Sequence, residues 1–138
     1  MANSTTIYTL PDGRSAVDVS EAKTLAEKDC GIVQNMTVDA LTVTLPATVV
    51  GYYYTIRNGG VAKTSGPARS GDDASLIVTI TPNGSDKIMG MEMTSSDADT
   101  LSNTKATANV GDEVSLVGDG VNGWMVTNMK GTWLQTAA

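Results

Sequence analysis

Apolar and polar residues alternate with a period of two along most of the chain after residue 32, the pattern of strands that bury one face. The stretch ALTVTL (40–45) is an example, because Leu41, Val43 and Leu45 fall on one side of an extended chain. Pro46 follows and cannot donate to a strand ladder, so the strand is predicted to end there. The alternation predicts a chain built mainly of β-strands.

A second strand is predicted over YYYTIR (52–57). Its faces carry Tyr52, Tyr54 and Ile56 on one side and Tyr53, Thr55 and Arg57 on the other. An Asn-Gly pair at positions 58 and 59 follows, and both residue types tolerate the positive φ of a tight hairpin. We therefore expect a hairpin turn at this point.

Further strands follow from the same pattern. They are predicted over residues 75–81, 87–93, 104–110, 113–117 and 124–129. Pro82, Asn83 and Gly84 form a turn cluster between the first two of these strands, which are expected to pair. About seven short strands separated by turns favour a sandwich or squat barrel. We predict an all-β fold, a single small β-sandwich or jelly-roll-like domain.

One short helical turn is predicted before these strands. Thr24 and Glu27 have the spacing of a capping box, and Gly31 closes the turn. Farther along, residues 61–74 have the composition of a surface loop.

The ends of the chain are predicted to lie outside the domain. Residues 1–22 are polar over most of their length, so we expect an extended N-terminal arm. Residues 23–134 form the sandwich domain, and 135–138 form a C-terminal tail.

Composition argues against several functions. The 138 residues include no histidine and one cysteine, and nine basic against fifteen acidic residues give a formal net charge of −6. Histidine is the commonest general base and metal ligand, so we expect neither an enzyme nor a bound cofactor. The basic residues are scattered singly, whereas nucleic acid binding needs a cationic face. No run approaches the ~18 apolar residues of a membrane helix, and no secretory signal is recognisable at the start.

The remaining candidates for chemistry have simpler interpretations. Cys30 lacks a neighbouring base to activate it and is expected to be a small buried residue. Acidic pairs could serve a hydrolase that works with two carboxylates, although acids in loops and at strand ends are ordinarily solvated. The pairs are Asp72 with Asp73, Asp97 with Asp99, and Asp112 with Glu113.

The glycine-rich stretch GDGVNG (118–123) invites a calcium or phosphate interpretation. It lacks the ligand spacing of an EF-hand, and a strand pattern rather than a helix follows it. We interpret it as a hairpin turn that needs positive φ values.

The chain has no phenylalanine, so the two tryptophans and the tyrosines are expected to supply most of the aromatic core. Trp124 alternates with Val126 and is predicted to lie in the core. Trp133 lies near the C-terminus and is our candidate for an intersubunit anchor.

Four stretches resemble, in order, a β-rich module of tailed bacteriophage structural proteins. They are KTLAEKDCG (23–31), LTVTLPATVVGYYYTIRNGG (41–60), VTITPNGSDKIMG (78–90) and LSNTKATANVGDEVSLVGDGVNGWMVTNMKGTW (101–133). The resemblance covers about residues 23–134 and rests on turn glycines, a strand-ending proline and tryptophan. The module occurs as a capsid decoration (cement) protein and within tail fibre proteins.

The resemblance implies a structural role in the virion. We expect a homotrimer, made in the host cytoplasm, that binds the major capsid protein on the outer capsid surface and cements neighbouring capsomers. Expected contact residues are Ile7, Tyr8, Leu10, Pro11 and Arg14 of the arm, with Trp133. The alternative is a tail fibre or appendage module that binds host surface glycan through Tyr53 and Trp133.

Overall fold

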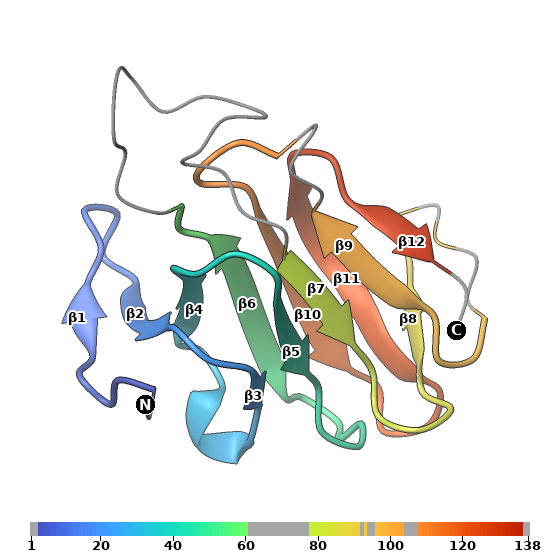
Figure 1. Cartoon of the computed structure of the whole chain (residues 1–138). Coiled ribbons are helices and arrows are strands. Elements are labelled where there is room, and N and C mark those ends of the chain that lie inside the picture. The colour runs from blue at the N-terminus through green and yellow to red at the C-terminus, as the bar shows by residue number, and fades with distance from the viewer. Residues whose placement is uncertain (1–2, 61–77, 92, 94–95, 104–107, 137–138) are drawn as a thin grey trace.

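The computed structural model describes residues 3–60, 78–91, 93, 96–103 and 108–136, which form a sandwich of two mixed β-sheets (Figure 1). One sheet contains, in spatial order, β1 (Tyr8–Thr9), β2 (Ser15–Val19), β4 (Val33–Met36), β6 (Tyr53–Asn58), β10 (Glu113–Gly118), β11 (Gly123–Lys130) and β8 (Lys87–Met89). The other contains β12 (Leu134–Thr136), β9 (Thr100–Asn103), β7 (Val78–Thr81), β5 (Leu41–Thr44) and β3 (Lys23–Thr24). The predicted all-β sandwich is confirmed.

Consecutive strands from β2 to β7 alternate between the two sheets, so the chain winds around the core. Each return enters its sheet in the same direction, which makes β2–β4, β4–β6, β3–β5 and β5–β7 parallel pairs. Later strands add antiparallel partners, β10 beside β6 and β9 beside β7. The sandwich is therefore mixed, because parallel neighbours need crossover connections and antiparallel ones can use short turns.

The core lies between the sheets and draws alternate residues from both. Val43 and Leu45 are fully buried, as their alternation predicts, and Tyr54 and Ile56 face them from β6. Trp124 is also fully buried, with its ring centroid 5.3 Å from that of Tyr54. The prediction that Trp124 belongs to the core is confirmed.

Two predicted hairpins are wrong. β7 and β8 do not pair, because the turn at Asn83 and Gly84 carries the chain from one sheet to the other. The Asn58-Gly59 pair does not form a hairpin either, since the neighbours of β6 are β4 and β10. Gly59 instead donates its amide to the Met36 carbonyl, 2.8 Å away, and packs against Asn35.

Other boundaries also differ from the predictions. The sequence predicts a strand over residues 104–110, but residues 108–110 form no strand, and the nearest strand, β9, ends at Asn103. Residues 104–107 and the loop at 61–74 lie outside the described residues. The helical turn is a 3-10 turn, η1 (Glu27–Asp29), and the proposed cap Thr24 belongs to β3. Asp29 takes the capping role, because its Oδ2 accepts from the Ala26 amide at 2.9 Å.

The predicted arm and tail are partly built into the sheets. Residues 15–19 form β2, which pairs in parallel with β4, and Ala16, Val17 and Val19 are buried. The polar composition of residues 1–22 hid this short apolar segment. At the other end, β12 pairs with β9, so Gln135 and Thr136 belong to a strand rather than to a tail.

Candidate binding site

The outer face of the seven-stranded sheet carries polar side chains on neighbouring strands. The register places Arg57 of β6 opposite Glu113 of β10, with Lys130 of β11 on the other side of Glu113. Two residues farther along the same face, Thr55 of β6 lies opposite Ser115 of β10, and their hydroxyl oxygens are 2.9 Å apart. Strand register thus brings together groups that lie far apart in the sequence.

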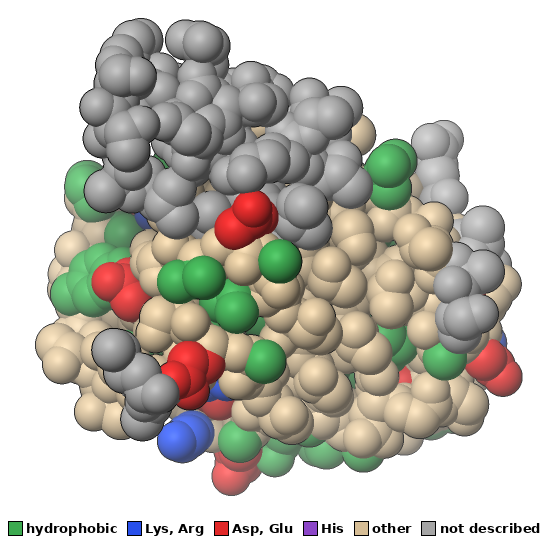
Figure 2. All heavy atoms as spheres, in the orientation of Figure 1, with side chains coloured by type: hydrophobic (Ala, Val, Ile, Leu, Met, Phe, Trp, Pro, Cys, Tyr) green, Lys and Arg blue, Asp and Glu red, His purple; other side chains and the backbone are tan. Residues whose placement is uncertain are grey.

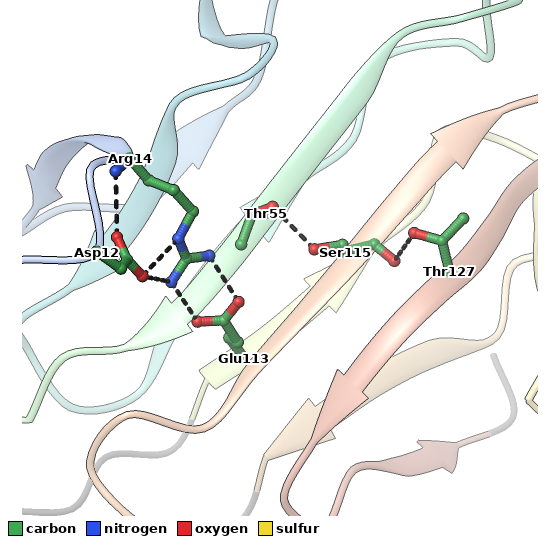
Figure 3. Close-up of polar contacts among 6 residues, drawn as sticks. All are labelled: Asp12, Arg14, Thr55, Glu113, Ser115 and Thr127. Carbon is green, nitrogen blue, oxygen red and sulfur yellow. Dashed lines mark hydrogen bonds and ion pairs between the residues drawn. The ribbon is translucent and has the colours of Figure 1, made fainter. Parts of the chain in front are cut away.

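Arg14 ties the N-terminal β1–β2 hairpin to this face (Figure 3). Its Nη1 and Nη2 donate to Glu113 Oε2 and Oε1 at 2.7 and 2.9 Å. Its Nε donates to Asp12 Oδ2 at 2.9 Å, and its backbone amide donates to Asp12 Oδ1 at 3.1 Å. The Glu113 side chain is only 11% exposed, so the guanidinium compensates for its burial.

The same contacts move the pKa values of the pair at the hairpin. Hydrogen bonding to Glu113, and then to Asp12, raises the pKa of Arg14 against the opposing effect of burial. The Arg14 backbone amide lowers the pKa of the Asp12 carboxyl, with the guanidinium adding to the effect. Both groups are therefore held in their charged forms at neutral pH.

A small apolar cluster also seats the hairpin. Leu10 is 8% exposed and packs with Ala16 and Val33. Val33 pairs with Ala16 and with Thr55, so the cluster lies on the same outer face. Packing and the Arg14 ion pair together position the turn of the hairpin over the sheet.

A pocket of about 250 Å³ lies where this turn meets the sheet. Leu10 and Pro11 supply apolar atoms to its wall. Gly111 lies beside Arg57, because a Cβ built on Gly111 would be 3.9 Å from Arg57 Nη2. The charged lining residues are Asp12, Arg14, Arg57, Glu113 and Lys130. Three cations against two carboxylates leave the pocket with a net charge of +1, in a chain whose net charge is −6.

Two of the three cations form no direct ion pair with a described residue, although the charge of Arg57 contributes to lowering the pKa of Asp12. Arg14 is neutralised by Asp12 and Glu113, whereas neither the Arg57 guanidinium nor the Lys130 ammonium forms a hydrogen bond or ion pair with a side chain of the described ranges. Arg57 is half-buried and Lys130 is exposed. The arrangement can therefore accept one small anion without displacing an internal ion pair.

The structure divides the predicted arm contacts among three places. Leu10, Pro11 and Arg14 line the pocket just described. Ile7 is 56% exposed and lines a separate pocket of about 180 Å³. Tyr8 donates its hydroxyl to Asp18 Oδ1 at 2.5 Å. Burial is the largest cause, and the hydrogen bond to Asp18 the next, of a rise in the pKa of Tyr8 to about 12.

Trp133 is not an exposed anchor. The side chain is 6% exposed, belongs to the main core cluster, and donates Nε1 to the Lys130 carbonyl at 3.0 Å. Trp133 lies between β11 and β12, and its indole joins the core. Nearness to the C-terminus alone does not indicate this burial.

Sequence reasoning missed Arg57, Glu113 and Lys130 as members of one site. The alternation of apolar and polar residues predicts that Arg57 and Ile56 lie on different faces of their strand. The same pattern could have separated Glu113 from Val114 in the next strand. No local pattern indicates which strands are neighbours, so the alignment of Arg57, Glu113 and Lys130 across three strands was not predictable.

The glycine-rich stretch forms the turn between β10 and β11, as predicted. Asp119 Oδ1 accepts from the amides of Val121, Asn122 and Gly123 at 2.8, 2.7 and 2.9 Å. These donors lower the Asp119 pKa to about 2, with the Gly123 amide contributing most. The carboxylate thus stabilises its own turn.

The acidic pairs do not form a two-carboxylate site in the described structure. Asp97 pairs with Lys87 at 2.5 Å, and Asp112 is 3% exposed and accepts from the Asn109 amide at 2.9 Å. Asp72 and Asp73 lie outside the described residues. Cys30 is half-buried against the core. The described ranges contain no group of three acidic or cysteine side chains placed to hold a metal ion.

No protein-family model, curated protein or solved structure matches the chain. In the part of the chain that the structure describes, no helical segment is long and apolar enough to cross a bilayer.

Proposed function

We propose that the chain is a structural protein of a tailed bacteriophage virion, which binds the outer capsid surface and cements neighbouring capsomers. It binds the major capsid protein as a homotrimer, at three-fold or quasi-three-fold positions, and stabilises the expanded head without catalysing a reaction. The resemblance of residues 23–134 to the phage module supports this role. The engagement of Glu113, Asp112 and Asp119 in internal contacts supports a binding protein over a hydrolase.

The observation that carries the proposal is an exposed apolar surface on two adjoining turns. Val49 and Val50 lie between β5 and β6, and Val121 lies between β10 and β11, with 41%, 76% and 81% of each residue exposed. The turns touch, because the Gly51 amide donates to the Gly118 carbonyl at 3.2 Å. We call Val49, Val50 and Val121 the apolar turn surface.

This surface lies at one end of the sandwich. Figure 2 shows hydrophobic side chains along the lower edge of the molecule, where Figure 1 places the turns after β5 and β10. Apolar side chains gathered on an exposed surface favour protein contact. Ile7, which is 56% exposed, and Pro11 remain available as further contacts, whereas Leu10 and Trp133 are buried.

The stabilising mechanism is multivalent. A trimer that touches several capsomers converts its second and third contacts into intramolecular ones, so weak contacts add to strong binding. Because the trimer binds the expanded lattice more tightly than other forms, binding stabilises that lattice by linkage.

The test is to add purified protein to undecorated, expanded heads and to measure co-sedimentation and the temperature of head rupture. Wild-type protein is expected to bind saturably and to raise the rupture temperature. Val50→Asp and Val121→Asp should weaken binding at least tenfold, since each places a charge in an apolar contact. A matched charge at Asn83, an exposed turn residue (Asn83→Asp), should not. Equal binding by all variants would contradict the proposed surface.

Binding of host glycan is the second candidate, favoured by Tyr53. This ring is 40% exposed at the edge of the polar outer face, and hydrogen bonding to Ser115 and Thr55 lowers its pKa. The burial of Trp133 removes the other proposed stacking platform. A glycan array with wild type and Tyr53→Ala tests the candidate, which requires binding that the substitution abolishes.

A further inference from the structure

We propose that the pocket between the β1–β2 turn and the outer face of β6, β10 and β11 binds a single carboxylate from an acidic side chain of a partner protein. Arg57 and Lys130 supply the charge, and Leu10 and Pro11 supply an apolar wall for the methylene groups of that side chain. The protein nature of the partner rests on the proposed function, whereas the carboxylate chemistry rests on the pocket alone.

The internal ion pair explains why the site is preformed. Glu113 lies between Arg57 and Lys130 in the cross-strand register and could have neutralised either of them. Arg14 occupies both Glu113 oxygens at 2.7 and 2.9 Å, so that carboxylate is already satisfied. Within the described ranges, the Arg57 and Lys130 side chains therefore remain as donors on either side of a neutralised residue, and an incoming anion does not compete with Glu113.

Charge balance favours a carboxylate over a phosphate. The pocket carries three cations and two carboxylates, a net charge of +1 that one singly charged group neutralises. A phosphate dianion would leave an excess negative charge beside Asp12 and Glu113. The planar guanidinium of Arg57 also matches the two oxygens of a carboxylate.

Size and net charge favour a side chain over a larger ligand. A volume of about 250 Å³ is below the usual range of drug-sized ligand pockets, and it suits one side chain. The whole chain carries a net charge of −6, which repels extended polyanions but leaves this local cationic site accessible. An acidic residue on a protein surface meets both conditions.

Peptide titration of the full chain tests the proposal without any capsid. The probe is a blocked peptide with one glutamate, and its glutamine counterpart is the control. Binding is measured from shifts of the Gly111 and Lys130 backbone amides and of the Arg57 Nε–H. The glutamate peptide should shift these signals, and Arg57→Gln and Lys130→Gln should each weaken its affinity about tenfold, as expected for loss of one charge-assisted hydrogen bond.

Matched variants separate a specific site from general electrostatics. Lys28→Gln removes the same charge from an exposed position outside this pocket and should change affinity less than twofold. Asp12→Asn removes a carboxylate from the pocket and should tighten binding. Thermal unfolding of each variant checks that it is folded.

Inorganic phosphate and glucuronate are titrated in parallel at constant ionic strength. The proposal is overturned if the glutamine peptide binds as well as the glutamate peptide, if Arg57→Gln has no more effect than Lys28→Gln, or if phosphate or glucuronate binds more tightly than the peptide. Because no heads are used, failure here leaves the capsid proposal standing, and failure of head binding leaves the carboxylate site standing.

Discussion

Arg14 and Glu113 are 99 positions apart in the sequence, yet their side chains meet through two parallel hydrogen bonds of 2.7 and 2.9 Å. The contact fixes the first hairpin of the chain onto the central strands of the seven-stranded sheet. A polar segment that composition assigns to a free arm is thereby made part of the domain surface.

Arg14→Ala should lower the free energy of unfolding by about 1–2 kcal/mol, because it leaves the Glu113 carboxylate without its partner in a mostly buried position. The loss should stay below the ~3–5 kcal/mol of a fully buried pair, since Arg14 is 39% exposed and water screens it. Urea unfolding at pH 7 measures the difference. Asp12→Asn, at the more exposed partner, serves as the control and should have a smaller effect; equal midpoints for Arg14→Ala and wild type would contradict the account.

Gly131→Ala and Gly13→Ala form a matched pair, because both glycines have a φ of 92°. A Cβ on Gly131 would lie 2.2 Å from Asp112 Cγ, whereas one on Gly13 would meet nothing within 4 Å. Gly13→Ala should cost about 1–2 kcal/mol from backbone strain alone. Gly131→Ala should cost about 2–5 kcal/mol, since overpacking against the buried carboxylate adds to that strain. Denaturant midpoints measured side by side decide the matter, and equal losses would show that the Asp112 contact is unimportant.

Trp133→Ala should destabilise the fold by about 3–5 kcal/mol, because it removes a large buried ring and leaves a cavity. Trp133→Phe keeps most of the volume but loses the hydrogen bond to the Lys130 carbonyl, so it should cost less. Leu134→Ala, at a residue that is 51% exposed, is the adjacent surface control and should have little effect. Unfolding together with light scattering separates core from interface: a changed subunit number with unchanged monomer stability would restore the anchor hypothesis.

Asp119 should make the free energy of unfolding fall as the pH drops below about 3.8. Its pKa is about 2 in the folded chain against 3.8 for the free group, so the folded state favours the carboxylate. The resulting stabilisation is fully present above pH 3.8 and is lost as the pH falls through about 2. Asp119→Asn can still accept the three amides but cannot titrate.

The test compares unfolding midpoints of wild type and Asp119→Asn from pH 5 to pH 2. Wild type should lose stability relative to the variant across that interval. Parallel curves would mean that the amide contacts do not distinguish the two protonation states.

Local features of the fold were predictable because they depend on neighbouring residues. Alternation located β5, β6, β10 and β11, and the glycines of GDGVNG located the turn after β10. Sheet membership was not predictable, because Ile80 and Ile88 have similar strand patterns and yet face the core from opposite sheets. The parallel winding joins partners such as Ala16 and Val33, whose pairing depends on the whole core.

The candidate site was predictable only in part for the same reason. The sequence predicts Leu10, Pro11 and Arg14 as arm contacts, and these three residues line one pocket. Arg57 and Lys130 join them through the register of three strands, which no stretch of sequence contains.

We propose that this sandwich sits on the outside of a phage head, and a density map of the intact virion is the decisive measurement. We expect density for three copies around three-fold or quasi-three-fold positions, with the apolar turn surface against the capsid. A map in which every outer-surface density belongs to other chains, with this protein absent or confined to the tail, would contradict it.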